Sequence, residues 1–439
     1  MPVKNTLNNQ AWETLFNRHN IINAVEQNGV FRISAATINQ IGREARLMTY
    51  SDREKSLPKI FKDNRLNIIS DARGSYLIGR FNLYQSITED PQLEISELPF
   101  PGDIETIDPN NIYSEPAGIL CAYNSGILSN LAGEDLRFTV GGRMSSGSFD
   151  YSISARAAGA NGAIRTETIS VANTQIEIDG GFEGTSKFIV LEAKNYGAED
   201  FNIKQLYYPY RLWREKTGKQ VIPVFMTLSN DVFSFYVYRF RDPSAYNSIE
   251  MVEQRKYRIE QVEIELDDIV AVLATSEQLP PTAAPNIPVP QADVFPRVVD
   301  LLGLAQANGF LTYEQIADVY IFTGRQADYY QNAARYLGLL ERGRDPETRK
   351  PVYALTAEGK RIMKMPSRQK FLALAGKILQ NPVFSRALRK YLDKREQPSR
   401  AEVCRIMEEE RVPLNETTVD RRARTVLGWI NWILSLKNQ

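Results

Sequence analysis

Cysteine and histidine are almost missing from this chain of 439 residues, which holds two cysteines and one histidine. Cys121 and Cys404 are too few and too far apart to suggest a disulfide scaffold or a thiol-rich zinc site. With His19 as the only histidine, a Ser-His-Asp triad, a Cys-His pair and a histidine metal cluster are all disfavoured. Catalysis in this chain must therefore rely on carboxylates, lysine, hydroxyl groups and bound metal.

Long apolar runs are missing as well. No stretch approaches the ~20 apolar residues that a membrane-spanning helix needs, so we expect no membrane partner. The first residues, MPVKNTLNNQAWETLF, lack the pattern of a signal peptide, which favours a cytoplasmic location. An apolar fraction of 43% and a charged fraction of 24% are ordinary for a soluble protein, and the length indicates two or three domains.

The net charge is zero, but the charges are unevenly distributed. From Arg297 onward there are 25 Lys and Arg against 16 Asp and Glu, an excess of +9, which leaves 28 basic against 37 acidic residues before it. A basic C-terminal third beside an acidic front is typical of an appended nucleic-acid-binding part. Basic helices that are simply solvated would give the same count, so charge alone leaves both interpretations open.

Three segments look like boundaries between domains. Residues 276–296 repeat proline, which forbids helix and predicts an extended linker. Residues 88–111 are acidic and contain proline, and a softer break lies at 364–369. These breaks divide the chain into four expected domains, at residues 1–90, 112–275, 297–365 and 366–439.

The first of these domains has the pattern of a winged helix. Residues 8–84 indicate helix, short strand and helix, followed by two β-like runs at 66–81 that flank Ala72-Arg73-Gly74. Helices followed by a hairpin suggest a winged helix with Arg73 in a wing that contacts DNA. A plain α+β packing domain with surface arginines is the alternative.

The C-terminal part gives a stronger winged-helix signal. A helix is predicted at 313–320 and another at 325–338, opened by Arg325, with Gly324 in the turn between them. A basic hairpin with Arg349 and Lys350 follows, in the position of a DNA-binding wing. Residues 399–435 suggest a second, similar unit with three arginines on its candidate recognition helix: Arg421, Arg422 and Arg424. Winged helices also mediate protein contacts, so the pattern leaves that role open.

The middle of the chain alternates between helix and strand. A helix is predicted at 114–133, with Ser114 as its N-cap and Pro116 in its first turn. A second helix is predicted at 200–218, and strands are expected at 136–140, 148–154, 174–179, 187–193, 220–229 and 232–240. We interpret this alternation as a core of helix, three strands, helix and strand, which predicts an α/β domain around a mixed sheet.

Charged residues interrupt two of these strands. Glu192 and Lys194 lie two residues apart, so they project from the same face of a strand, and Asp179 lies across a predicted hairpin from them. Carboxylate oxygens are hard ligands that hold Mg²⁺, and a metal ion activates water for attack on phosphorus. Lys194 could orient that water or stabilise the transition state. A salt-bridge cluster at a sheet edge is the alternative, but it accounts poorly for the second acid.

Asp179, twelve intervening residues and then Glu192-Ala193-Lys194 resemble the motif of the PD-(D/E)XK nucleases. Ile178 stands where that motif usually has proline. Within the superfamily, residues 142–153, 201–213 and 238–259 resemble segments of type II restriction endonucleases with appended winged helices. The resemblance implies an α/β (α+β) fold class: a restriction-endonuclease-like core with a mixed sheet, flanked by winged-helix-like domains, with a mainly α C-terminal part.

The resemblance also implies a function and its participants. It implies Mg²⁺-dependent, sequence-specific cleavage of double-stranded DNA, with Glu115 assisting the metal site and Gln205 as a polar helix residue near it. A palindromic target would imply a homodimer, and a restriction enzyme implies a cognate DNA methyltransferase in the same system. Three further residues, expected in a Gly-rich loop beside the core, could approach DNA: Arg143, Ser145 and Ser146.

Two other functions stay open at this point. A repair or junction-resolving nuclease of the same fold would carry the same three charged residues, although the predicted winged helices favour recognition of a specific DNA sequence. A DNA-binding regulator with an inactive nuclease core would normally have lost one of Asp179, Glu192 and Lys194, and all three are present.

Overall fold

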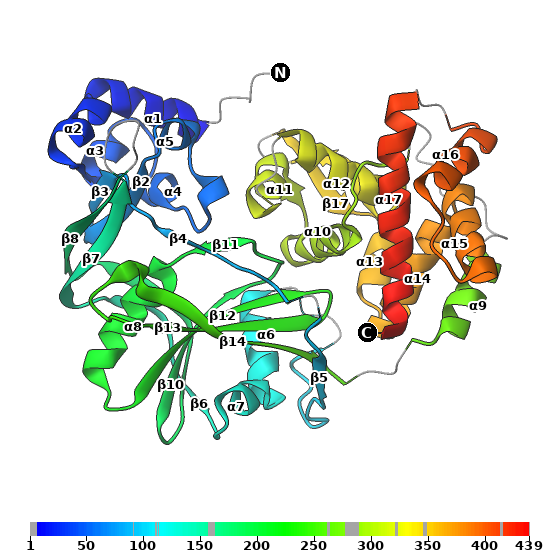
Figure 1. The fold of residues 1–439 in the computed structure, drawn as a ribbon, viewed down its shortest axis with the longest axis horizontal. Helices are drawn as coiled ribbons and strands as arrows, with labels where there is room; N and C mark the ends of the chain where they lie inside the picture. Colours follow the sequence, from blue (N-terminus) through cyan, green and yellow to red (C-terminus); the bar gives the residue numbers. More distant parts are fainter. Residues whose placement is uncertain are drawn as a thin grey trace. The chain divides into compact units, whose positions relative to one another are not determined.

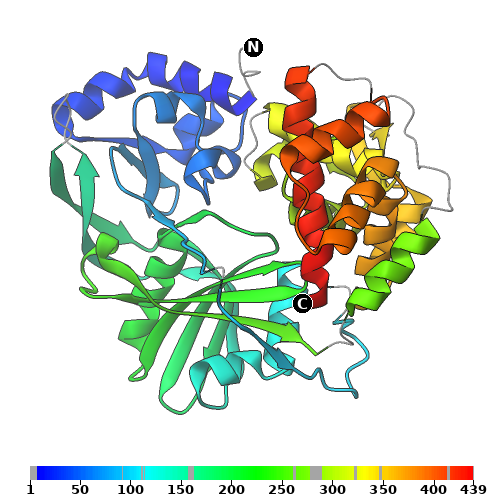
Figure 2. The ribbon, with the colours of Figure 1, turned by 45° about the vertical axis from the view of Figure 1, so that its right-hand side comes forward.

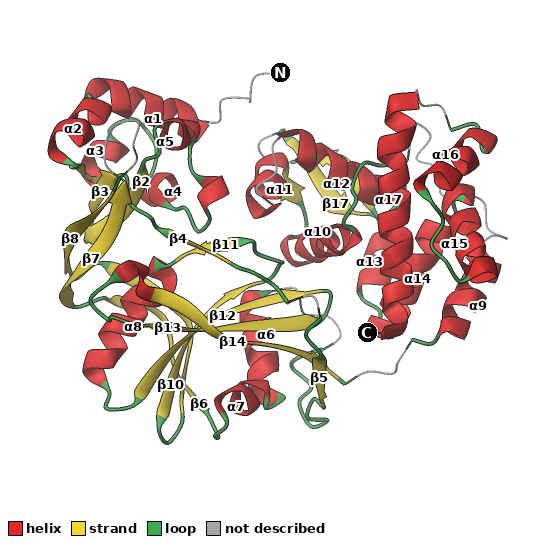
Figure 3. Ribbon diagram, in the orientation of Figure 1, coloured by secondary structure: helices red, strands yellow, loops and turns green. Residues whose placement is uncertain are grey.

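A computed structural model describes residues 7–438, apart from 91, 110–111, 113, 157–162, 261–263, 277–288, 321–323, 346–348 and 413–415. The chain is mixed α/β with mixed sheets, and its C-terminal part is mainly helical, as the sequence predicts (Figures 1 and 3). It divides into two compact units, one of residues 1–98, 122–228 and 232–258 and the other of residues 99–121, 229–231 and 259–439. Within the described ranges, no helix combines the length and apolar character needed to cross a membrane.

The N-terminal part of the first unit follows the predicted order of helices, a short strand and a hairpin. Its elements are α1 (Leu7–Arg18), α2 (Ile21–Asn28), β1 (Val30–Ser34), α3 (Ala35–Asn39), α4 (Ala45–Thr49), η1 (Glu54–Ser56), α5 (Lys59–Asp63), β2 (Asn67–Ala72) and β3 (Ser75–Gly79). Trp12, Phe16 and Phe61 meet edge to face in its core. The strands pair in the order β1-β3-β2, and the predicted β2–β3 hairpin turns at Arg73.

A second hairpin extends this N-terminal sheet. β7 (Ser148–Arg156) pairs with β8 (Ile164–Ala172), and β8 meets β2 in parallel at Ala172 and Ala72. The result is a five-stranded sheet in the order β1-β3-β2-β8-β7 (Figure 1). The expected strand at 148–154 therefore forms, but it belongs to this sheet and not to the central one. An alternating pattern identifies a strand without identifying its partner, which is why the sequence misplaced it.

The central sheet of the first unit has seven strands in the order β5-β14-β13-β12-β10-β9-β6. They are β5 (Ile95–Leu98), β6 (Arg137–Ser145), β9 (Gln175–Glu183), β10 (Lys187–Lys194), β12 (Gln220–Ser229), β13 (Val232–Phe240) and β14 (Ile249–Ile259). β6, β9 and β10 are antiparallel neighbours, whereas β12 runs parallel to β10. α6 (Glu115–Asn124) and α7 (Ile127–Ala132) precede these strands in the chain. If the β7–β8 hairpin is left out, the elements follow the predicted order of helix, three strands, helix and strand.

The helix α8 (Lys204–Lys216) connects β10 to β12 and is buried on several sides. Its buried residues share one apolar cluster with β2, β3, β7 and β8 of the five-stranded sheet and with β12 and β13 of the central sheet. Tyr207 and Tyr208 are fully buried in this cluster, so their rings pack in the core. The buried residues of α8 lie between Leu206 and Leu212, so this part of the helix is held by apolar packing with both sheets.

The second unit has one continuous core. It contains α9 (Leu266–Ser276), α10 (Phe295–Asn308), β15 (Leu311–Thr312), α11 (Tyr313–Tyr320), α12 (Gly324–Tyr336), β16 (Leu340–Arg344), β17 (Pro351–Leu355), α13 (Ala357–Met363), α14 (Ser367–Leu379), α15 (Pro382–Lys394), α16 (Arg400–Glu409) and α17 (Glu416–Ser435). Buried residues from α9 to α17 form a single cluster, so the core has no break at residue 365. Val289 and Ala292, expected in the linker, are buried in that cluster.

The two halves of this unit differ in their secondary structure. In the first half, α11 has the predicted bounds, and the strands pair in the order β15-β17-β16. Gly359 packs so closely that a Cβ there would lie 2.2 Å from the Leu339 carbonyl oxygen. Between residues 366 and 438, the described chain contains helices and no strand, so the predicted second winged helix lacks its wing. α17 instead uses a long apolar face, which includes Trp429, to pack beside α15 and α16 (Figures 1 and 2).

Candidate active site

The three predicted charged residues lie where two central strands stop pairing. β9 and β10 are paired from Glu183 and Phe188 to Gly180 and Leu191, and the described ladder ends there. On its other side, β10 stays paired with β12 through Lys194. The last residues of β10 therefore have a strand on one side only. On the other side, side chains can form hydrogen bonds with the backbone groups that a neighbouring strand would otherwise pair with.

A bulge in β9 lies at the same point. Val140 pairs with Gly181 and Gly142 pairs with Ile178, so two steps along β6 correspond to three steps along β9. The extra residue falls at Asp179 and Gly180. Bulges turn side chains away from their regular direction and are over-represented next to active sites. Gly181 is required beside it, because a Cβ there would lie 2.8 Å from that of Val140.

Asp179 bridges the two strands with its side chain. Its Oδ2 accepts a hydrogen bond from the Ala193 backbone N–H at 2.9 Å, so the carboxylate satisfies a donor for which the described β9–β10 ladder offers no carbonyl. Among the described residues, no hydrogen bond reaches Oδ1 of Asp179. Because the residue is only half-buried, that second oxygen can serve as a ligand.

Glu192, Lys194 and Gln205 are in direct contact. The Lys194 Nζ donates to Glu192 Oε1 at 2.6 Å and to the Ala193 carbonyl oxygen at 2.9 Å. The Gln205 Nε2, in the first turn of α8, donates to the same Glu192 oxygen. Glu192 and Lys194 are each only 6% exposed. A buried pair of this kind places a carboxylate and an ammonium where water screens them little.

The orientation of Gln205 leaves one acceptor in the site. Since its amide nitrogen faces the Glu192 carboxylate, its Oε1 points elsewhere, and this buried oxygen has no hydrogen-bond partner in the part of the chain that the structure describes. A buried acceptor without a donor is costly and calls for an explanation. A water molecule or a hydrated cation could supply the missing donor.

This donor set fits Mg²⁺. The ion typically takes one or two carboxylates and keeps several waters. Asp179 and Glu192 would supply the carboxylates here, and the orphaned amide oxygen of Gln205 could accept a hydrogen bond from one of the waters. The described residues contain no cluster of three or more His, Cys, Asp or Glu side chains that could hold a metal ion.

Lys204 ties this end of α8 to the N-terminal sheet. Its Nζ donates to the Ser70 Oγ at 2.6 Å and lies 5.3 Å from the Tyr208 ring centre. Burial lowers the pKa of Lys204 to about 8. Ser70 also accepts from the Thr174 hydroxyl, and its carbonyl accepts from Tyr208. The helix that carries Gln205 is thus fixed by polar contacts to β2.

Several predicted DNA contacts are exposed, and others are not. Arg73 is exposed at the β2–β3 turn, and Arg349 and Lys350 are exposed in the β16–β17 hairpin, as expected. Arg421 and Arg424 are also exposed on α17. Arg422 is half-buried, burial lowers its pKa, and its Nε has no described hydrogen-bond partner, so its contact with DNA stays a prediction. The side chain of Arg325 lies outside the described residues.

Of the predicted Gly-rich loop, Arg143 and Ser145 lie in β6, and Ser146 lies in the short connection to β7. β6 continues through Gly141 and Gly142, the latter at φ 87°, and pairs Arg143 with Glu177 and Ser145 with Gln175. Ser146 is completely buried, so it cannot contact DNA in this conformation. The glycines accommodate an irregularity within a strand. Glu115 opens α6 in the second unit, and its role beside the metal stays a prediction.

Comparisons with known families cover most of the chain. Three family models match in succession: domain of unknown function DUF6996 over residues 9–78, DUF6997 over 79–258 and DUF7226 over 297–438. No curated protein and no solved structure matches the chain. The candidate site lies entirely within the DUF6997 match, whereas Ser70, which holds Lys204, belongs to the DUF6996 match.

Proposed function

We propose that this protein is a Mg²⁺-dependent endonuclease that cleaves double-stranded DNA at specific sites, in the manner of a type II restriction enzyme. The observation that carries the proposal is the meeting of Asp179, Glu192, Lys194 and Gln205 at the end of the β9–β10 ladder. These groups supply two carboxylates, an ammonium and an amide oxygen. That combination suits phosphodiester hydrolysis without histidine or cysteine.

The order of the central strands supports the same class. A helix, three antiparallel strands, a helix and a strand parallel to the third agree with the core of the PD-(D/E)XK nucleases. In this core, Asp179 is on the second strand and Glu192 and Lys194 are on the third. A structural ion-pair cluster would need neither the bulge at Asp179 nor the orphaned oxygen of Gln205.

Each side chain then has a distinct role. Asp179 and Glu192 would hold the metal, which when bound supplies positive charge near the phosphate and acidifies water. The Lys194 ammonium, fixed by Glu192 and the Ala193 carbonyl, stabilises negative charge that develops on the phosphate oxygens. The Gln205 Oε1 accepts a hydrogen bond from the attacking water and orients it.

DNA binding would come from the flanking parts of the chain. The N-terminal strands pair as β1-β3-β2 and the C-terminal strands as β15-β17-β16, so in both sheets the third strand lies between the first two. Together with the preceding helices, this arrangement supports two winged helices. Their exposed wing residues, Arg73 and the pair Arg349 and Lys350, would contact phosphates, while base contacts give specificity. A homodimer and a cognate methyltransferase remain part of the proposal.

Incubation of the purified protein with mixed plasmid and genomic DNA and Mg²⁺ tests this function. Discrete fragments are the expected result. A smear, or selective cutting of branched DNA, would favour a repair or junction-resolving nuclease. DNA that is retarded on a gel but intact would favour a binding protein with an inactive core. The DNA should come from several sources with different methylation, because methylation at the site can block or permit cutting.

A further inference from the structure

A segment of the N-terminal part is attached to the loop that follows Lys194. We call residues 51–56 the strap and residues 195–202 the catalytic loop. The strap begins shortly after α4, with Tyr50 between them, and its last residues form η1. The catalytic loop runs from the end of β10 to β11 (Asp200–Asn202), just before α8. One end of this loop therefore carries Lys194, and its other end leads into Gln205.

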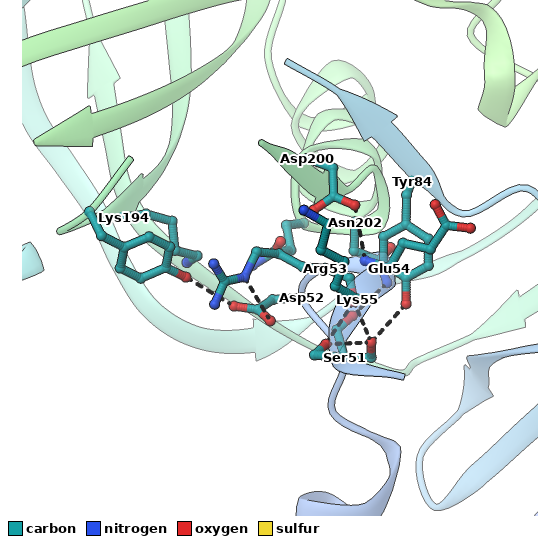
Figure 4. A network of polar contacts seen from close by, with 12 residues as sticks. Ser51, Asp52, Arg53, Glu54, Lys55, Tyr84, Lys194, Asp200 and Asn202 are labelled. Atoms are coloured by element: carbon teal, nitrogen blue, oxygen red, sulfur yellow. Dashed lines mark hydrogen bonds and ion pairs between the residues drawn. The ribbon is translucent and has the colours of Figure 1, made fainter. Parts of the chain in front are cut away.

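Hydrogen bonds connect the strap to the far end of the catalytic loop. The Asn202 backbone N–H donates to the Asp52 carbonyl at 2.7 Å, and its side-chain amide donates to the Ser51 carbonyl at 3.0 Å. The Glu54 N–H donates to the Asp200 carboxylate at 3.1 Å, and burial raises the pKa of this carboxyl. Figure 4 shows this network with Lys194 at its edge. The strap thereby fixes the backbone just before α8.

Arg53 and Asp52 hold the near end of the loop. The Arg53 guanidinium lies over the Tyr196 ring, 4.6 Å from its centre, and the Tyr196 hydroxyl donates to Asp52 at 3.4 Å. Arg53 is 6% exposed and Tyr196 is 7% exposed, so the stack is well shielded from water. A desolvated cation–π contact is stronger than an exposed one. Tyr196 lies two residues beyond Lys194.

The strap is one of several attachments at this place. β4 (Tyr84–Ser86) pairs with β11, the Tyr84 hydroxyl is hydrogen-bonded to Ser51, and the Tyr246 hydroxyl donates to the Asn202 side chain. Both ends of the catalytic loop are therefore defined by contacts with other parts of the first unit. Arg53 and Asp52 differ from these attachments because both contact Tyr196, which is closer to Lys194 along the chain than Asp200 and Asn202 are.

From this arrangement we infer that Arg53 is a positioning residue for Lys194 and Gln205, which it reaches through Tyr196 and the catalytic loop. The inference rests on the proposed nuclease function. It makes the N-terminal part an integral component of the catalytic centre in addition to its proposed DNA contacts. The two family matches meet between residues 78 and 79, but the strap in the first match and the catalytic loop in the second are in direct contact.

The test compares Arg53→Met with Tyr196→Leu, the double variant and Arg53→Lys in the full chain. The control is Lys59→Met, which removes a surface cation from the exposed ion pair with Asp63. Cleavage is measured at saturating and limiting DNA. Because a small misplacement of reacting groups is costly, kcat should fall about 10- to 100-fold in Arg53→Met, while KM changes by less than about threefold. Arg53→Lys, which keeps a cation over the ring, should retain intermediate activity.

The double variant and amide hydrogen exchange separate this role from general destabilisation. If Arg53 acts through Tyr196, the two losses in kcat should not multiply in the double variant. Exchange in residues 195–205 should be faster in Arg53→Met than in the parent and in Lys59→Met. Losses that multiply, a change confined to KM, or an Arg53→Met enzyme as fast as the parent would overturn the inference.

The experiment still tests the role of Arg53 if a variant does not fold or if the parent is inactive. If Arg53→Met does not fold, Arg53→Lys replaces it, and an activity equal to that of the parent counts against the inference. If the parent cleaves no DNA, the proposed function fails, and hydrogen exchange alone decides whether Arg53 positions the loop. Unchanged exchange at 195–205 in that case would refute the positioning role as well.

Discussion

The Asp179 carboxylate accepts a hydrogen bond from the Ala193 backbone N–H at 2.9 Å, just beyond the last described pair of the β9–β10 ladder. One side chain thus closes the strand pairing and brings a carboxylate next to Glu192. This double role affects the choice of variants. Asparagine at position 179 can still accept the Ala193 N–H while it removes the charge, whereas alanine would remove both.

Lys194→Ala should slow cleavage by about 10²-fold or more, because it removes a preorganised cation from a shielded site. Lys194→Arg should not restore the parent rate, since a planar guanidinium cannot replace a compact ammonium between Glu192 and the Ala193 carbonyl. Single-turnover cleavage at saturating DNA measures both effects. Lys219→Ala, which breaks another lysine–carboxylate pair of the first unit, is the matched control. A Lys194→Ala enzyme as fast as this control would reduce Lys194 to a structural partner of Glu192.

Neutralisation of Arg349 and Lys350 together should weaken DNA binding and reduce the slope of log K against log salt by up to about two units. Each phosphate contact releases counterions, so the loss of two contacts lowers the number released. Removal of Arg421 and Arg424 should have an effect of similar size if α17 also meets phosphate. Binding of the full chain to duplex DNA is measured in Ca²⁺ over a range of salt concentrations. Lys360→Ala with Lys364→Ala removes the same charge at the end of α13 and should leave the slope unchanged. Equal slopes for the wing variant and this control would contradict a wing–phosphate contact.

Asp300 should make the second unit less stable as the pH rises from about 4 to 7. Burial raises the pKa of Asp300 to about 7, and the Ser229 hydroxyl donates to its carboxyl at 2.9 Å. In this interval the folded protein keeps a proton that the unfolded chain has lost, so an increase in pH favours unfolding. The free energy of unfolding of the parent, relative to Asp300→Asn, should fall by on the order of 2 kcal/mol between pH 4 and 7. Urea unfolding at several pH values measures it, and parallel curves for the two chains would contradict the assignment.

The sequence predicted the location of the candidate site because its geometry is largely local. Residues that are two positions apart on a strand project from the same face, and a tight hairpin brings Asp179 across from Glu192 and Lys194. The pattern could not reveal the bulge at Asp179 or the end of the ladder, since both depend on how β9 pairs with β6 and β10. The resemblance implied that Gln205 lies near the metal site, but the sequence did not predict its contact with Glu192.

The fold was predictable element by element, but the partners of its strands were not. The bounds of α11 and the β2–β3 hairpin follow from local periodicity and turn residues. The assignment of β7 to the N-terminal sheet depends on long-range pairing at Ala72 and Ala172, which has no local signature. Likewise, the strap contacts Tyr196 across more than a hundred residues of sequence, so no spacing rule could indicate Arg53.

Cleavage assays of Asp179→Asn and Glu192→Gln in Mg²⁺ test whether Asp179 and Glu192 support metal-dependent cleavage of DNA. Asp179→Asn keeps a hydrogen-bond acceptor for the Ala193 N–H, and Glu192→Gln keeps one for Lys194 and Gln205. Both substitutions remove the negative charge of a proposed metal ligand. Glu177→Gln, which neutralises an exposed carboxylate on the same strand, is the matched control. The parent and Glu177→Gln should cut DNA into discrete fragments, whereas both site variants should lose cleavage, and at least one of them should still bind the same DNA in Ca²⁺. Cleavage by both site variants at the parent rate would contradict this role of Asp179 and Glu192.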